Sequence, residues 1–265
     1  MSESDNFKLA SENAKAKGDA RLKDLSLRVE LQRESGRETA CLFLTHASHY
    51  PELSAQPESL LHTQELKYFH SLTALKRKKD YLLGRYAAKR ALLSLSLGRA
   101  ASAIHIRSGV FQQPVVRGPN CEGLSICITH SGDFAAAIAF PTGHPLGIDL
   151  EWYDSALVDT LKEHIDPSEL PLAELCASEA ERYTRVWTVK EALSKILQCG
   201  LTTPFSVFKL QPALATNDLP WSGGFENFSQ YRFMSLCSQK LCFALVHPGR
   251  TTVVLALEQI IDFAG

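Results

Sequence analysis

The chain has 265 residues, of which 45% are hydrophobic and 22% are charged. This composition is typical of a globular protein with a packed core, and it excludes a wholly disordered, collagen-like or fibrous chain. Because 28 basic residues are balanced by 29 acidic ones, the net charge of −1 argues against duplex DNA or an anionic membrane as a general partner.

The amino-terminal stretch and the cysteines indicate a cytoplasmic protein. Residues 1–23 carry few large apolar side chains and are expected to form a flexible leader. They also lack the apolar core of a signal peptide or membrane anchor. The seven cysteines are scattered, without a Cys-x-x-Cys pair or metal-finger spacing, so we interpret them as reduced thiols.

Residues 24–145 are expected to form an amino-terminal subdomain. Apolar residues alternate or cluster on both sides of a polar stretch at 32–39, which predicts a β-hairpin. Apolar residues at helical spacing, with few Gly and Pro, predict a helical block over 58–97. Strands are then predicted at 102–106, 125–129 and 135–140.

Residues 146–265 are expected to form a carboxy-terminal subdomain that repeats this order in outline. A strand is predicted at 146–153, followed by a long helical region from about 155 to 199. Further strands are predicted near 205–211, 231–235, 241–247 and 252–257. The order of the elements therefore predicts two copies of one plan.

Two carboxylates stand on one face of the strand that opens the second half. Residues 147–151 read Gly-Ile-Asp-Leu-Glu, and the period of two in a strand places Asp149 and Glu151 on the same side. On spacing alone such a pair is either a solvated strand face, which is the commoner case, or a site for a hard cation.

A predicted helix follows, and residues 187–195 within it read Trp-Thr-Val-Lys-Glu-Ala-Leu-Ser-Lys. Trp187, Glu191 and Lys195 recur at every fourth position on one side. Another side carries an apolar stripe formed by Val189, Leu193, Ile196 and Leu197. Glu191 and Lys195 also have the spacing of an ordinary surface ion pair. Together with the strand, however, they supply three oxygen ligands and one cation, a set that suits magnesium and a polyphosphate.

These two motifs resemble those of the 4′-phosphopantetheinyl transferases, specifically the Sfp-like class with two related subdomains in one chain. The family pattern is Gly-Ile/Val-Asp-x-Glu and, some forty residues later, Trp/Phe-Ser/Thr/Cys-x-Lys-Glu-Ala/Ser-x-x-Lys. Residues 147–151 and 187–195 fill every fixed position. The resemblance covers roughly residues 60–260, and it implies an α+β fold of two pseudo-twofold-related subdomains, each with a small antiparallel sheet and a packed helix.

Weaker matches upstream imply a coenzyme A site between the subdomains. Residues 83–92 resemble the family's Gly-Arg helix, and residues 129–131 resemble its Ser-His-Ser strand end. In the family that histidine, here His130, contacts the 3′-phosphate. The residues implied to bind coenzyme A are Lys76, Arg77, Arg85, Arg107, Thr129, His130 and Lys195. By themselves, the basic run at 76–79 is equally typical of a solvated helix face, and His130 of a hydrogen-bonded loop residue.

One segment departs from the family pattern. Residues 112–114 read Gln-Gln-Pro where many relatives carry Gly-Lys-Pro, so a lysine expected near the 3′-phosphate is missing. Lys76 or Arg77, and Arg107, lie near positions where relatives place basic phosphate contacts, and they are candidates to supply this charge.

The resemblance implies transfer of the 4′-phosphopantetheine arm of coenzyme A to a serine of a carrier protein, with release of adenosine 3′,5′-bisphosphate. Asp149, Glu151 and Glu191 would hold magnesium at the diphosphate, and Lys195 would contact a phosphate oxygen. Positioning and electrostatic stabilisation should dominate such a reaction. Asp149, Glu191 and Lys195 are the expected catalytic residues. The serine proton would go to Glu191 or to a metal-bound water that Glu191 orients.

The implied partner is an apo acyl, peptidyl or polyketide carrier protein, whose acidic helix would meet basic and apolar groups. A single chain is expected to suffice, as a monomer without nucleic acid or membrane. Arg182, Arg185 and Lys190 are candidate carrier contacts by proximity, although each is equally typical of an ordinary surface charge.

Two other functions fit parts of the pattern. A magnesium-dependent nuclease also needs acids and a lysine, but Tyr153 stands where its Glu-x-Lys pattern requires lysine. A catalytically inactive carrier-binding module is the other, and the intact acidic residues argue against it.

Overall fold

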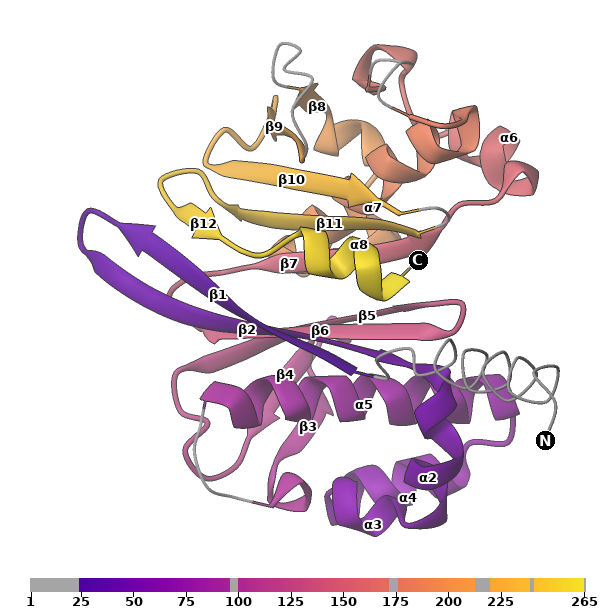
Figure 1. The fold of residues 1–265 in the computed structure, drawn as a ribbon, viewed down its shortest axis with the longest axis vertical. Coiled ribbons are helices and arrows are strands. Elements are labelled where there is room, and N and C mark those ends of the chain that lie inside the picture. Colours follow the sequence, from indigo (N-terminus) through magenta and orange to yellow (C-terminus); the bar gives the residue numbers. More distant parts are fainter. Residues whose placement is uncertain (1–23, 96–99, 172–175, 213–219, 239–240, 265) are drawn as a thin grey trace, which may run out of the picture.

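Two antiparallel sheets form the framework of the computed structural model, which describes residues 24–95, 100–171, 176–212, 220–238 and 241–264. Their strand orders are β12-β1-β2-β6-β5 and β7-β11-β10-β9-β8, and each carries a long helix, α5 or α7 (Figure 1). This confirms the predicted α+β class. The predicted leader, 1–23, lies outside the described residues. No helix in the described ranges is long and apolar enough to cross a membrane.

The first half is built on the predicted hairpin. β1 and β2 pair along their whole length, and alternate residues from Leu25 to Leu31 are buried. On the other face of the sheet, α5 packs through Ala87, Ala88 and Ala91, whose small side chains allow close approach. The elements of this half are β1 (Asp24–Arg33), β2 (Gly36–His46), α2 (Tyr50–Ala55), α3 (Pro57–Leu60), α4 (Thr63–Ser71), α5 (Leu75–Leu95), β3 (His105–Ser108), β4 (Pro114–Arg117), β5 (Leu124–Ser131) and β6 (Phe134–Pro141).

The second half repeats a sheet with a helix on it. Ser178 caps the start of α7 by accepting a hydrogen bond from the Glu181 amide, and Gln198, with φ of 56°, ends the helix in the left-handed region. The predicted apolar stripe is confirmed, since Val189 and Leu193 are buried against the sheet. The elements are β7 (Gly147–Trp152), α6 (Val158–Lys162), α7 (Glu179–Leu197), β8 (Leu210–Pro212), β9 (Trp221–Phe225), β10 (Tyr231–Cys237), β11 (Leu241–Pro248), β12 (Thr252–Val254) and α8 (Glu258–Ala264).

The largest apolar cluster joins the two sheets. It contains residues of β1, β2 and β6 from one sheet and of β7 and β11 from the other. The chain end ties the halves together further, because β12 pairs with β1 and α8 packs beside it. This core therefore holds together β5 and β7, which both line the cleft described below.

A buried Lys–Glu pair occurs at the equivalent place in each half. Lys89 of α5 donates to Glu65, and Lys190 of α7 donates to Glu169; all four side chains are at most 2% exposed. Each lysine also donates to a backbone carbonyl, of Leu60 or Phe205, and each glutamate also accepts two backbone amides, of His62 and Ile106 or of Asp166 and Leu210. This shared network supports the prediction of two copies of one plan.

The structure differs from the sequence prediction in several places. The strand predicted near 205–211 is a 3-10 helix at Phe205–Phe208 followed by the short β8, and the strand predicted at 102–106 gives way to a 3-10 helix at Ala101–Ala103 and β3. The described part of the helical region predicted at 155–199 is divided into α6, α7 and short 3-10 turns, and β4 and α8 were not predicted.

The helical block predicted at 58–97 is three helices, because Leu61 and His62 are extended and His62 begins α4 with a capping box. Strand β9 was not predicted, since its Gly223 and Gly224 disfavour a strand. Gly223 is nevertheless required there, as a Cβ would lie 2.4 Å from the Gln211 carbonyl oxygen.

Candidate functional site

The acidic strand lies at the seam between the two sheets. Thr129 Oγ1 on β5 donates to Asp149 Oδ1 at 2.7 Å, and Ser131 Oγ donates to Glu151 Oε2 at 2.7 Å. Both carboxylates therefore face β5, which confirms that they share one side of the strand. Gly147 lets α7 lie against β7, because a Cβ at this position would lie 2.1 Å from the Ala192 carbonyl oxygen.

Lys195 reaches the seam from α7. Its Nζ donates to Asp149 Oδ1 at 2.6 Å and to the Ile148 carbonyl at 3.2 Å. Burial, the largest single effect, opposes the charged form of Lys195, but the combined attraction of Asp149, Cys127 and Glu191 raises the pKa of Lys195 overall. The lysine thus pairs with the strand acid and not with Glu191 one turn away. Asp149 is 3% exposed, and its Oδ2 has no hydrogen-bond partner.

The other two acids predicted to bind magnesium, Glu151 and Glu191, lie close enough to Asp149 to be affected by its negative charge. Burial and then Asp149 raise the pKa of Glu151 to about 7, and the same two causes raise the pKa of Glu191. No three acidic, histidine or cysteine side chains in the described residues stand as a ready-made metal cluster. The donor set nevertheless fits a hard divalent cation, since a buried carboxylate oxygen lacks a partner and two neighbouring carboxylates resist ionisation without one.

A cleft of about 560 Å³ opens beside Asp149 and Lys195. It is lined by six of the seven residues predicted to bind coenzyme A, which are Arg77, Arg85, Arg107, Thr129, His130 and Lys195. Lys76, Glu151 and Glu191 do not line it. The tertiary structure therefore gathers basic side chains from α5, β3 and β5 around one hollow, next to the acidic strand.

Arg85 is the most firmly positioned of these basic groups. Its Nε lies 3.1 Å from Glu65 Oε1, and its guanidinium carbon lies 4.6 Å from the centre of the Tyr81 ring. Tyr81 and Tyr68 also line the cleft, with ring centres 5.0 Å apart. The sequence carried no signal for the two tyrosines beyond their spacing around one predicted helical block, and they were missed.

Two of the predicted carrier contacts are wrong. Lys190 is 0% exposed and Arg185 is 1% exposed, so neither side chain can meet a partner protein. Lys190 belongs to the buried pair with Glu169, and Arg185 donates to the Ser235 carbonyl on β10 at 3.0 Å. Position on the motif helix suggested proximity, but both side chains turn into the packed interior. Arg182 is partly exposed and donates to the Pro171 carbonyl.

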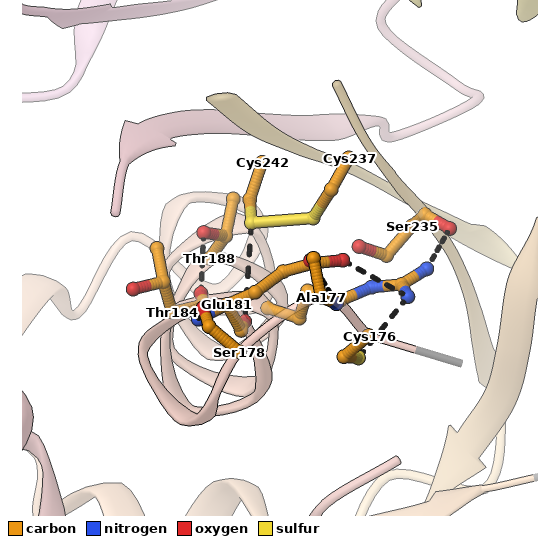
Figure 2. Close-up of a disulfide and its surroundings, with 10 residues drawn as sticks. Cys176, Ala177, Ser178, Glu181, Thr184, Thr188, Ser235, Cys237 and Cys242 are labelled. Carbon is orange, nitrogen blue, oxygen red and sulfur yellow. Dashed lines mark hydrogen bonds and ion pairs between the residues drawn. A yellow bond between two sulfur atoms is a disulfide. The ribbon is translucent and has the colours of Figure 1, made fainter. Parts of the chain in front are cut away.

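The expectation that all cysteines are reduced is wrong for one pair. Cys237 on β10 and Cys242 on β11 are joined by a disulfide, packed beside α7 (Figure 2). The hairpin register places these residues directly opposite each other, which their spacing of five did not reveal. The other five cysteines are free thiols, and a reducing compartment stays a prediction.

Comparisons with known proteins match the part of the chain that holds both acidic motifs. The family model of the 4′-phosphopantetheinyl transferase superfamily matches residues 145–240. A curated relative, the holo-[acyl-carrier-protein] synthase of Mycoplasma mycoides, is 35% identical over 81 residues, which cover 30% of this chain and 72% of the relative.

Two solved structures resemble less than half of the chain. A holo-(acyl-carrier-protein) synthase from Bacillus anthracis, in complex with CoA (3′,5′-ADP), has a TM-score of 0.35 and 18% identity, covering 44% of this chain and 97% of that one. A holo-ACP synthase from Plasmodium yoelii has a TM-score of 0.33 and 17% identity, covering 44% of this chain and 95% of that one.

Proposed function

Because this chain belongs to the 4′-phosphopantetheinyl transferase superfamily and is a phosphopantetheinyl transferase, we propose that it moves the phosphopantetheine arm of coenzyme A to a serine of an apo carrier protein. Adenosine 3′,5′-bisphosphate is the second product. The observation that carries the proposal is the Asp149–Lys195 pair at the edge of a basic cleft. An acyl carrier protein is the first substrate to test, since the curated relative is named for it.

Coenzyme A is proposed to occupy the cleft of about 560 Å³, with its phosphates among the basic side chains. The basic side chains that would surround the phosphates are those of Arg77, Arg85, Arg107 and His130. Gln113 stands where relatives carry a lysine and lies outside the lining of this cleft, although its neighbour Gln112 lines it. The arginines are therefore proposed to provide the charge that the missing lysine would supply. Tyr68 and Tyr81 offer aromatic faces suited to a nucleobase.

The reaction joins the serine oxygen to the pantetheine-side phosphorus while the bond to the bridging diphosphate oxygen breaks. A magnesium ion held by Asp149, Glu151 and Glu191 would supply positive charge at the diphosphate when bound. Lys195, fixed by Asp149, presents its ammonium where negative charge develops on the leaving bisphosphate. Glu191, whose burial raises its pKa, is suited to accept the serine proton.

The direct test combines the purified protein with coenzyme A, magnesium and an apo acyl carrier protein, followed by intact mass measurement of the carrier. We expect a phosphopantetheine adduct that disappears when magnesium is chelated. An adduct that forms equally well in chelator would overturn the magnesium assignment. The absence of an adduct on acyl, peptidyl and polyketide carriers alike would overturn the proposed function.

Removing one of the arginines that line the coenzyme A cleft should weaken binding of coenzyme A more than binding of dephospho-coenzyme A. Arg107 is exposed and makes no ion pair in the described residues, so Arg107→Gln should leave the fold intact. Because a charged hydrogen bond to phosphate is lost, we expect the KM for coenzyme A to rise about tenfold or more. The KM for dephospho-coenzyme A, which lacks the 3′-phosphate, should change much less. Equal effects on the two compounds would contradict a role at that phosphate.

Lys76→Gln is the matched control for this measurement. Lys76 is the basic neighbour of Arg77 on α5, but it does not line the cleft. Its replacement removes the same unit of charge and should change either KM by less than about twofold.

Without magnesium, Glu151 should make the stability depend on pH. Its folded-state pKa of about 7 lies above the ordinary value of 4.5, so the folded protein binds the proton more tightly than the unfolded chain. The free energy of unfolding should therefore fall as pH rises from 5 to 7, by on the order of 3 kcal/mol at most, and level off above.

Thermal melts in chelator at pH 5 and pH 8 measure this effect, with Glu151→Gln as the comparison. The Tm of the variant should fall less between the two pH values, because the amide does not ionise. Magnesium should raise the Tm of the unmodified protein most at pH 8. A Tm at pH 8 that does not respond to magnesium would speak against the ligand set.

A further inference from the structure

A second cleft, of about 670 Å³, lies at the opposite end of the seam between the halves. It is formed by the tip of β1 and by the loops that follow β6, β9 and β11. Three arginines from separate segments line it, namely Arg33, Arg232 and Arg250, and no acidic residue does. None of the residues that line this cleft lines the coenzyme A cleft described above.

The three arginines lack acidic partners. None of them takes part in the ion pairs found among the described residues. Arg232 is held in place, because its Nη1 donates to the Ser229 carbonyl at 2.9 Å and to the Tyr231 carbonyl at 2.8 Å. Gly224 on the neighbouring strand leaves room for it, since a Cβ there would lie 3.0 Å from that nitrogen.

Two histidines, His144 and His247, lie close enough to these arginines to be affected by their charge, although burial is the larger cause of their pKa shifts. Burial and then Arg33 lower the pKa of His144, against an opposing effect of Glu38 on β2. Burial lowers the pKa of His247, and Arg232 acts in the same direction. An uncompensated cluster of fixed cations attracts an anionic surface or ligand.

An apolar groove of about 340 Å³ borders both this cleft and the coenzyme A cleft. It shares Lys195 with the coenzyme A cleft and Pro145 with the arginine cleft. Its walls include Phe111, Ile126, Phe140, Leu146 and Ile196. At the β3–β4 hairpin tip that borders it, Val110 is 88% exposed and Phe111 is 71% exposed, which is unusual for such side chains in water.

We propose that the apolar groove and the arginine cleft together form the docking surface for the carrier protein, with acidic carrier residues in the arginine cleft. This rests on the proposed function, in which a protein substrate must bring a serine from solvent to Lys195. A partner that covers Lys195 also covers the groove that begins there and meets the arginines where the groove ends. An apolar centre beside a charged margin is the usual anatomy of a protein interface.

The test reverses two arginines that form no hydrogen bond or ion pair in the described residues. Arg33→Glu/Arg250→Glu should weaken binding of an apo acyl carrier protein, its acceptor serine replaced by alanine, about tenfold or more at low salt. The measurement is fluorescence anisotropy of the labelled carrier. The KM for the carrier should rise in parallel, while the KM for coenzyme A and kcat at saturating carrier stay unchanged. High salt should reduce the difference in carrier affinity between the variant and the unmodified protein.

Two further variants make the result specific. Arg28→Glu/Arg117→Glu changes the net charge by the same amount, at exposed positions that line neither of the two clefts nor the apolar groove. The affinity of this variant for the carrier should stay within about twofold of the unmodified protein. Phe111→Ser tests the groove separately and should weaken carrier binding without the salt dependence, because the lost contact is apolar.

The possible results distinguish a failure of the docking-surface proposal from a failure of the proposed function. Carrier binding unchanged by the arginine reversal would overturn the docking surface while leaving transferase activity intact. A reversal that instead abolishes binding of inorganic pyrophosphate, measured by calorimetry, and spares the carrier would show a small-anion site and also overturn it. An unmodified enzyme that transfers phosphopantetheine to no carrier would refute the proposed function itself.

Discussion

Asp149→Asn should lower kcat for phosphopantetheine transfer by about 10²-fold or more, as expected when a pre-organised electrostatic group is removed. Asp149 contacts more groups of the site than the other two acids do. Lys195 Nζ lies 2.6 Å from its Oδ1, and Thr129 donates a hydrogen bond to the same oxygen. Its Oδ2 is buried without a hydrogen-bond partner. The asparagine keeps the shape and the Thr129 contact but removes the charge that holds Lys195 and would bind magnesium.

The measurement is steady-state transfer to an acyl carrier protein, with the Tm recorded beside it. The variant should stay folded, because the lost carboxylate also repelled Glu151 and Glu191. Near-normal kcat in Asp149→Asn, or in Glu191→Ala, would rule out the ligand set proposed here. Glu191→Gln, which keeps shape without charge, tests the base role: loss of kcat together with loss of its pH dependence would support Glu191 as the proton acceptor.

Lys190→Met should destabilise the protein by about 3–5 kcal/mol, since it leaves Glu169 buried without its cation. This is a large fraction of the total stability of a typical domain. Urea denaturation measures the change. The folded enzyme should nevertheless keep most of its kcat, because Lys190 Nζ points to Glu169 and the Phe205 carbonyl, away from the cleft.

The double variant Lys190→Met/Glu169→Gln separates this explanation from a simple packing defect. With both charges gone, much of the lost stability should return, so the two changes should not be additive. Lys195→Met should differ in activity: it also leaves a buried acid, Asp149, without its cation, so its stability should fall too, but it should lose most of its kcat because Lys195 lines the cleft. A Lys190→Met protein that is stable but inactive would place this lysine in the reaction instead.

The sequence predicted the local elements of the site well because they depend on short-range periodicity. The alternation at 147–151 placed Asp149 and Glu151 on one side of a strand, and both do accept hydrogen bonds from β5. The hairpin of β1 and β2 and the apolar stripe of α7 followed from the same kind of pattern. Strand β9 was missed because glycine, which has low strand propensity, is required there by close backbone contact.

Long-range partners could not be read from the chain. In the motif at 187–195 both lysines occupy fixed positions of the pattern, but only the fold shows that Lys190 is buried against Glu169 and that Lys195 reaches Asp149. The Cys237–Cys242 disulfide likewise depends on the hairpin register. Periodicity states which face of an element a side chain occupies, whereas packing decides what that face meets.

The amino-acid sequence by itself determined the family and the acids and lysine of its two motifs, because both depend on residue identity at fixed spacing. Only the tertiary structure decided that Lys76 lies outside the cleft while Arg77, Arg85 and Arg107 line it, and that Arg33, Arg232 and Arg250 meet at the far end of the seam. The reason is physical: these groups come from segments far apart in the chain, and they meet only once the apolar core has brought the two sheets together.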